Sequence, residues 1–455
     1  MSDKETPALP KSLRTWDGIA LLIGITIGSG IYSTPYLIAG YFPDFGTVAI
    51  AWVAVGLFVL VSGMVYAELG TRLPATGGEF VYIERAFGRW PAFMYGWAQL
   101  FIIRTSPAAG LSIIAADYVG YFVPLGDTSH LVVALGILVI LGVVNVIGVR
   151  WASLTNKFST VVKVTGLLVF AAAGLFMLQS VPMQFGEVTP PTTGLSHTGN
   201  LIAALFLIIF SHTGWDRVGY VAGEMEDPRK SLPRTMLIGL TLILVIYWAV
   251  NMVYYGVLGV DGLRATTTPA ATVMSQLTGR IGGGIVAILA IVSALGSING
   301  TMMASSRVYF AMSQEGLLFK WLDYVHPRFR TPTRAVIAHV VWAGVILIVR
   351  GSFASIVAGM VFGVLIFYGL TAVALFKFRR EGDGDSIAWK MPGYPWLPGL
   401  YLITIVGLLV TRVIFEWQAS LIDFAFIATG LPVYFIWMRH RAAALLTGSG
   451  TPPAA

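Results

Sequence analysis

Small and polar residues interrupt the middle of the first long apolar stretch of the chain. No charged side chain occurs between Gly18 and Pro43, a length sufficient to cross a bilayer. The centre of this stretch reads GITIGSGIY, from Gly24 to Tyr32. Glycine weakens a helix and frees backbone groups that lipid cannot hydrogen-bond, so such a break is tolerated only beside a polar cavity. Many secondary transporters build a mid-membrane site from broken helices, so a solute transporter is the leading interpretation.

The ends of two half-helices at this break would suit a zwitterion such as an amino acid. Unpaired amides at Ser29 and Gly30, at the start of the second half-helix, favour a carboxylate. Free carbonyls near Thr26 and Ile27, at the end of the first, favour an ammonium. Gly28 would let a ligand approach the backbone closely. The alternative is that these glycines only allow close helix packing.

A second apolar stretch, residues 199–222, is broken in the same way. Its centre reads FSHTGWD, from Phe210 to Asp216, and the carbonyls of Phe210, Ser211 and Thr213 could add acceptors. The two interrupted spans lie five apart, which indicates two five-helix repeats of opposite orientation, at about 17–178 and 199–376.

Two cationic side chains lie deep within predicted spans. Ionisable groups at such depth are functional or extend to the membrane surface. Lys163 lies within the fifth span and Arg104 within the third. We expect Arg104 to face the bundle interior and to pair with a carboxylate or carbonyls, as a modulator that does not touch substrate.

Composition assigns the chain to the polytopic membrane proteins. It is 56% hydrophobic and 11% charged, where about 25% charged is usual for soluble domains. There is no cysteine, which excludes a disulfide-linked partner subunit, and no metal-ligand spacing among the histidines, so we expect neither an enzyme nor a cofactor. Twelve apolar spans are predicted, at 18–40, 46–68, 91–119, 130–149, 156–178, 199–222, 236–258, 281–310, 334–350, 353–376, 396–414 and 420–438.

The positions of lysine and arginine predict the orientation of these spans. With both ends of the chain in the cytoplasm, the opposite loops hold only Arg264, Arg280, Arg350 and Arg412. This predicts a multi-pass protein of the plasma or inner membrane whose net charge of +7 reflects topology and not nucleic-acid binding. The predicted parts are a cytoplasmic tail at 1–16, a membrane domain at 17–440 with two extra helices at about 396–438, and a second tail at 441–455.

Several motifs resemble one known family. The chain is similar to the amino acid–polyamine–organocation superfamily and, within it, to the L-type amino acid transporters. The resemblance covers about the first three quarters of the chain and implies a leucine-transporter-like, all-helical fold with inverted repeats and two broken helices. It also implies amino acid transport, often by exchange. The motifs are GSGIY at 28–32, YAELGTRLPATGGEFVYIERAFG at 66–88, IIRTSP at 102–107, GWDRVGYVAGEMEDPRKSLPR at 214–234 and SINGTMMASSRVYFAMSQEGLL at 297–318.

The resemblance also implies roles for individual residues. Phe210 matches the aromatic gate that closes over the substrate, and substrate contacts fall at the two breaks. Lys163 aligns with a lysine at the sodium position of related transporters, where it would bridge the first helix to the eighth near Ser305. This implies sodium independence, and a proton released by Lys163 could also couple transport.

Two residues depart from the family pattern. Asp216 stands where the family has asparagine; it could favour a cationic substrate, bind a proton, or pair with Arg217 as a helix cap. His212 stands where tyrosine is common, and it could titrate near neutral pH or form a hydrogen-bonded part of the cavity wall.

Together these observations predict sodium-independent exchange of small to medium neutral L-amino acids by alternating access. The alternatives are a proton-coupled symporter, an exchanger of cationic amino acids or polyamines, and a membrane receptor or sensor that does not transport.

Overall fold

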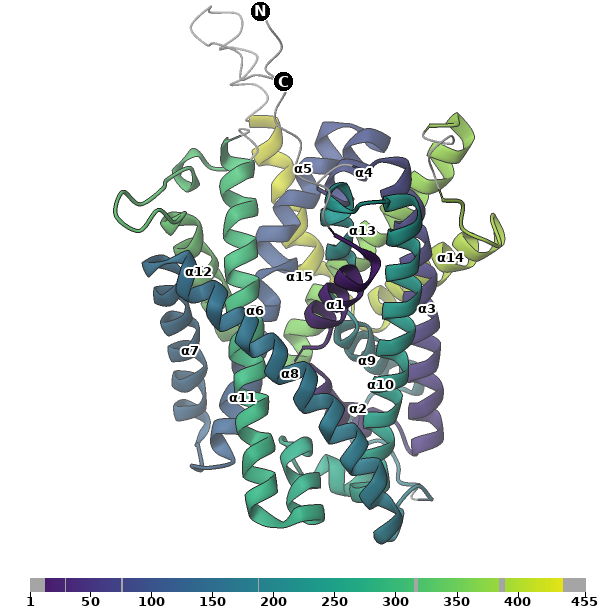
Figure 1. The fold of residues 1–455 in the computed structure, drawn as a ribbon, viewed down its shortest axis with the longest axis vertical. Coiled ribbons are helices and arrows are strands. Elements are labelled where there is room, and N and C mark those ends of the chain that lie inside the picture. The colour runs from purple at the N-terminus through teal and green to yellow at the C-terminus, as the bar shows by residue number, and fades with distance from the viewer. Residues whose placement is uncertain are drawn as a thin grey trace, which may run out of the picture.

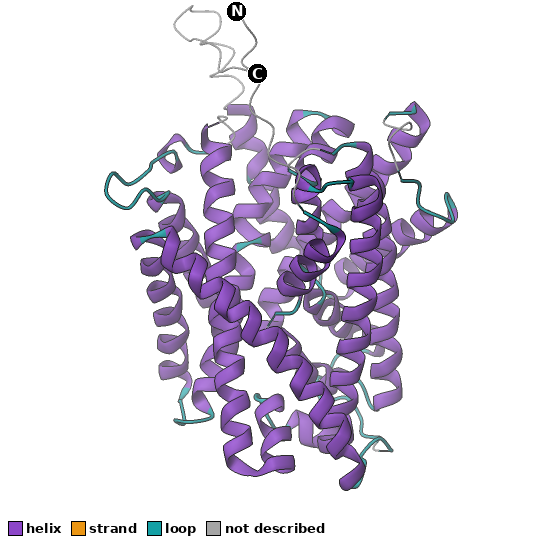
Figure 2. Cartoon of the chain, in the orientation of Figure 1, coloured by secondary structure: helices purple, strands orange, loops and turns teal. Residues whose placement is uncertain are grey.

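The computed structural model describes residues 13–28, 30–74, 77–186, 188–314, 318–383 and 389–436, and this part of the chain is almost entirely helical (Figures 1 and 2). A single β-bridge joins Leu13 to Met225. The α-helices are α1 (Thr15–Thr26), α2 (Gly30–Tyr41), α3 (Phe45–Arg72), α4 (Glu79–Phe87), α5 (Arg89–Ala98), α6 (Thr105–Gly120), α7 (Asp127–Ile147), α8 (Val149–Met177), α9 (His197–Ser211), α10 (Pro228–Arg264), α11 (Pro269–Gln314), α12 (Thr333–Arg350), α13 (Phe353–Glu381), α14 (Trp396–Phe415) and α15 (Trp417–Ala428).

The helices agree with the predicted spans. Within the described residues, 11 helices are long and apolar enough to cross a membrane, and the bent pair α1 and α2 brings the number to 12. The seventh span was predicted to end at 258, and α10 is kinked at Gly259, where φ is 66°. The eighth was predicted to begin at 281, and α11 is kinked at Gly279, where φ is 81°. The all-helical membrane fold is therefore confirmed, whereas the inverted symmetry and the domain boundaries stay predictions.

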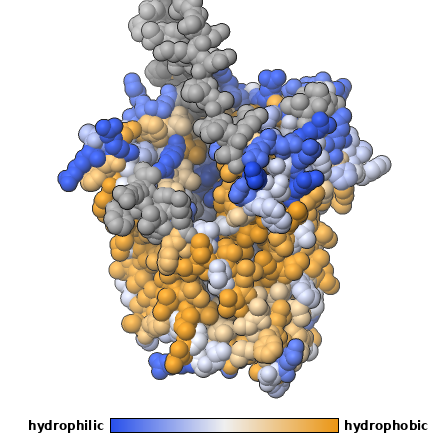
Figure 3. All heavy atoms as spheres, in the orientation of Figure 1, coloured by the Kyte–Doolittle hydropathy of each residue, from blue (hydrophilic) through white to orange (hydrophobic). Residues whose placement is uncertain are grey.

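The outer surface of the bundle is apolar over most of its height. Figure 3 shows hydrophobic residues around the middle of the visible face and hydrophilic residues gathered toward its upper end. Large apolar side chains such as Ile140, Phe176 and Ile285 are more than half exposed. Such exposure suits contact with lipid chains and is unusual in a protein surrounded by water.

Both predicted helix breaks are present. The first span ends as an α-helix at Thr26, Ile27 has an extended conformation, and α2 resumes at Gly30 with a bend of 50°. The sixth span ends as an α-helix at Ser211, and Gly214 has a φ of 110°, which only glycine adopts readily. Beyond it the chain continues as a 3₁₀-helix over Trp215–Glu224.

Backbone hydrogen bonds join the two broken spans to one another. The Leu13 amide donates to the Glu224 carbonyl, and the Glu226 amide donates to the Leu13 carbonyl, both at 3.0 Å. The start of α1 is therefore fixed to the end of the 3₁₀-helix.

A buried ionic network lies between α3 and α13. The Glu68 carboxylate accepts hydrogen bonds from Arg72 at 2.8 and 2.9 Å and from Arg379 at 2.6 and 2.7 Å. It also accepts the Met391 amide at 2.8 Å, so the segment that precedes α14 is held in the same network.

Candidate functional site

The two helix breaks open onto one cavity of about 430 Å³. Thr26, Gly28 and Gly30 line it from the first break, and Phe210, Ser211, Thr213 and Gly214 line it from the second. A carbon placed on Gly28 would have no neighbour closer than 3.9 Å, so the backbone at this point is open to the cavity. Both breaks therefore line one cavity, and their role in binding substrate stays a prediction.

A tyrosine of α10 links the carbonyls of the two breaks. The Tyr247 hydroxyl lies 3.1 Å from the Thr26 carbonyl and 3.0 Å from the Ser211 carbonyl, in position to donate to either. A carbonyl oxygen has two lone pairs, so each acceptor keeps one for another donor, such as a substrate ammonium. The chain offers no glycine or small-residue signal at Tyr247, and the sequence analysis missed it.

The start of α2 packs closely on the end of α9. The Ser211 hydroxyl donates to the Leu207 carbonyl, so in its 3.0 Å contact with the Thr34 hydroxyl it is the acceptor. A carbon on Gly30 would lie 3.2 Å from the Phe210 ring, so a side chain at this position would require the ring to shift. Phe210 also packs edge-on against Phe353, with ring centroids 5.5 Å apart.

Some predicted contacts are not available to a ligand. The Phe210 carbonyl already accepts both the amide and the hydroxyl of Thr213, at 2.9 and 2.7 Å, so it has no lone pair left. Ile27, whose carbonyl was predicted to accept the ammonium together with that of Thr26, is not among the residues that line the cavity. Ser29 lies outside the described residues.

Three cationic side chains line the cavity. Lys163 is buried, with only 4% of its surface exposed. Among the described residues its ammonium has no hydrogen-bond partner. Arg104 follows a π-helical turn at Gln99–Ile103 and donates to the Gln99 side-chain oxygen at 2.7 Å and to the Tyr220 hydroxyl at 3.1 Å. The predicted carbonyl partner of Arg104 is thus a side-chain amide. The third cation, Arg217, was not singled out from the sequence as a site residue.

Three further predicted residues lie outside the cavity lining. Ser305 is fully buried in α11 and makes no hydrogen bond to Lys163. His212 contacts the Ile208 carbonyl through Nδ1 and packs against the rings of Trp52 and Tyr247, away from the cavity. Asp216 lines a smaller neighbouring pocket and accepts the Tyr368 hydroxyl at 3.4 Å.

Ser297 is a cavity residue that the sequence analysis did not single out. It lies on α11 beside Gly28, and its buried hydroxyl has no hydrogen-bond partner among the described residues. It is also the first residue of the motif at 297–318, which was used for recognition and not as a source of site residues.

The smaller pocket contains a buried carboxyl group at Glu79, the first residue of α4. The hydroxyls of Tyr66 and Tyr95 donate to its two oxygens, the latter at 2.7 Å. Burial raises the pKa of Glu79 to about 8. This carboxyl group is therefore mostly protonated at neutral pH.

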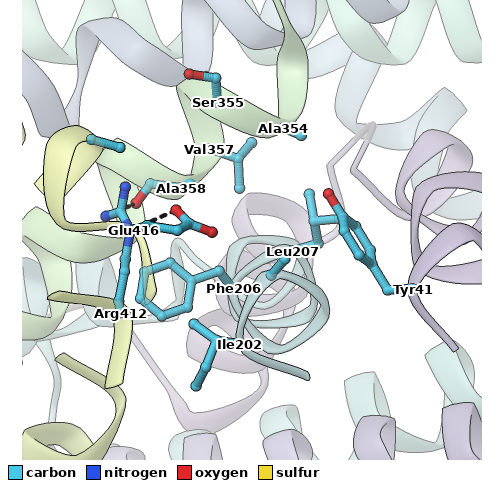
Figure 4. Close-up of a pocket in the computed structure, with 12 residues that line it drawn as sticks. Tyr41, Ile202, Phe206, Leu207, Ala354, Ser355, Val357, Ala358, Arg412 and Glu416 are labelled. Atoms are coloured by element: carbon cyan, nitrogen blue, oxygen red, sulfur yellow. Dashed lines mark hydrogen bonds and ion pairs between the residues drawn. The ribbon is translucent and has the colours of Figure 1, made fainter. Parts of the chain in front are cut away.

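A separate pocket of about 150 Å³ lies between α9, α13 and the turn that joins α14 to α15 (Figure 4). Arg412 lies beside Phe206 there, donates to the Ala358 carbonyl at 2.7 Å and pairs with Asp423 at 2.7 Å. Arg350 contacts the same carboxylate. Because the charged groups satisfy one another, this cluster ties helices together and is not a second substrate site.

Comparison with known proteins identifies the family. The model of the amino acid permease family matches residues 13–437. The serine/threonine exchanger SteT of Bacillus subtilis (strain 168) is 28% identical over 446 residues, covering 96% of this chain and 99% of that protein. The human b(0,+)-type amino acid transporter 1 and the human cystine/glutamate transporter are each 27% identical, covering 96% of this chain and 90% and 88% of those proteins. With its two helix breaks opening onto one cavity, the chain belongs to the amino acid permease family, as its resemblance to the L-type amino acid transporters predicted.

Proposed function

We propose that this protein exchanges amino acids across a membrane by alternating access. The observation that carries the proposal is the single cavity shared by the breaks at Gly28–Gly30 and Ser211–Gly214. Amides at the start of α2 would bind the substrate carboxylate, and the carbonyls of Thr26 and Ser211 would accept its ammonium. The names of the relatives, which include exchangers and transporters of amino acids, support the same activity.

Phe210 is proposed as the gate on one side of this site. Its ring lies between Gly30 and Phe353, so rotation of the ring would separate α2 and α9 from the start of α13. The buried network around Glu68 would close the opposite side, since it ties the C-terminal part of α3 to the C-terminal part of α13. Alternating access requires that the two closures open in turn.

Transport is proposed to be independent of sodium. The Lys163 ammonium supplies a fixed positive charge in the cavity wall next to α1 and α11. A fixed charge does not leave with the substrate, so it cannot draw on a sodium gradient. The membrane is proposed to be the plasma or inner membrane, with both termini in the cytoplasm.

Counterflow into proteoliposomes tests the proposal. Vesicles loaded with a mixture of unlabelled amino acids should accumulate external labelled amino acids, and replacing Na⁺ with choline should change nothing. Strict sodium dependence would contradict the role of Lys163, and absence of counterflow with every amino acid would contradict exchange.

Proton-coupled symport is the second candidate, because the Lys163 ammonium has no hydrogen-bond partner among the described residues and could release a proton. Empty vesicles with a more alkaline interior separate the two mechanisms. A symporter would accumulate labelled amino acid in them, whereas an obligatory exchanger would not. Replacing Lys163 with methionine should abolish a proton-driven component and leave exchange measurable.

A further inference from the structure

The charges that line the cavity are all of one sign. Lys163, Arg104 and Arg217 contribute to its wall, and no aspartate or glutamate does so within the described residues. An uncompensated charge in a membrane interior is costly, and the usual compensation is a group of opposite charge. Within the part of the chain that the structure describes, Arg104 is the only one of these cations whose side chain has hydrogen-bond partners, and these partners, Gln99 and Tyr220, are neutral.

Arg217 faces the cavity because of the 3₁₀ geometry that follows the second break. Side chains three residues apart share one face of a 3₁₀-helix, and Gly214, Arg217 and Tyr220 all line the cavity. The Arg217 guanidinium forms no hydrogen bond or ion pair with a described residue, although Asp216 is its neighbour in sequence. It lies within electrostatic range of both Lys163 and Arg104, which repel it.

The nearby carboxyl groups offset only part of this charge. Asp216 attracts Arg217, and Arg104 and Arg217 also line the smaller pocket that holds the Asp216 carboxylate, which accepts the Tyr368 hydroxyl. One carboxylate can offset only one of the three cations. Glu79 in the same pocket is mostly protonated at neutral pH, since burial raises its pKa to about 8. The cavity therefore keeps an excess of positive charge.

We infer that the transported amino acid carries an anionic side chain, and that the carboxylate of this side chain pairs with Arg217. The inference rests on the proposed exchange function and differs from the expectation of a neutral substrate, which rested on the backbone groups at the breaks and on the family resemblance. A neutral amino acid brings one carboxylate and one ammonium and leaves the excess charge uncompensated. An acidic amino acid brings a second carboxylate and a net charge of −1, which offsets part of the excess.

The test compares acidic amino acids with their neutral amides, which differ little in size. Counterflow of labelled L-glutamate and L-aspartate is measured beside that of L-glutamine and L-asparagine. A charge-assisted hydrogen bond in a low-dielectric site predicts that the wild type prefers each acid by at least about tenfold in kcat/KM. Arg217→Gln should reduce this preference by about tenfold or more, and Arg217→Lys should retain most of it. Arg14→Gln, at an exposed ion pair outside the cavity, is the charge-matched control and should leave the preference unchanged.

Each outcome is decisive. Wild-type preference for the amides would overturn the substrate class while leaving amino acid exchange intact. An acid preference that Arg217→Gln does not reduce would overturn the assignment to Arg217. Absence of counterflow with all four compounds and with every other amino acid would overturn the proposed exchange itself. If Arg217→Gln does not fold, stabilisation of the wild type against heat by glutamate but not by glutamine measures the same preference, and equal stabilisation would overturn it.

Discussion

Replacing Tyr247 with phenylalanine isolates the hydroxyl that links the two helix breaks. The ring stays, so its packing against Trp52 and His212 is retained. Two carbonyls compete for one hydroxyl hydrogen, at 3.1 and 3.0 Å, so only one hydrogen bond is lost at any moment. A buried acceptor that loses its donor costs about 1–3 kcal/mol. Because Thr26 and Ser211 line a cavity that admits water, we expect the lower part of this range, about 1–2 kcal/mol.

Tyr254→Phe is the matched control on the same helix. Tyr254 is fully buried like Tyr247, but its hydroxyl has no hydrogen-bond partner among the described residues. Its removal should leave the free energy of unfolding unchanged or raise it slightly. Denaturant titration of both variants in the same detergent compares the two. Equal free energies of unfolding would refute the assignment of Tyr247 as the group that stabilises the breaks.

Three other substitutions test separate parts of the structure. Glu68→Gln should destabilise the folded protein by about 3–5 kcal/mol, because it removes the charge of the buried carboxylate that pairs with both Arg72 and Arg379; size-exclusion profiles at rising temperature measure the loss. Burial raises the pKa of Glu79 to about 8, above its ordinary value of 4.5. The folded state therefore holds this proton more tightly than the unfolded state, and the free energy of unfolding should fall as pH rises from 4.5 to 8. Glu79→Gln should flatten a plot of Tm against pH over this window. Gly30→Val should abolish counterflow while folded protein remains, since a side chain there would press on Phe210; Gly136→Ala, with open space around it, should transport normally.

Helix positions could be predicted because each depends on local sequence. Apolar length set the spans, and the positions of small residues set the breaks at Gly28–Gly30 and His212–Gly214. The predicted end of the seventh span lies beside the kink at Gly259, and the predicted start of the eighth span lies beside the kink at Gly279.

Contacts between distant segments could not be predicted in the same way. Whether His212 lines the cavity depends on how it packs against Trp52 of α3. The local sequence around His212 does not predict this contact. Arg412 was expected in an outer loop, yet it is buried at the end of α14, because Asp423 provides a charge partner beyond the turn. Arg217 lines the cavity because the second half of its span is a 3₁₀-helix, whereas the sequence predicted only that the span was broken.

The bridge between Leu13 and Met225 also constrains the order in which the protein is assembled. The two bridged residues are followed in the chain by Arg14 and Glu226, which are 212 positions apart. At synthesis rates of about 5–20 residues per second, the start of α1 waits roughly 10–40 s for its partner to emerge. During that interval the first broken helix resides in the membrane without the segment that later fixes it. The ribosome has therefore completed the sixth span before the cavity between the two breaks acquires its final geometry.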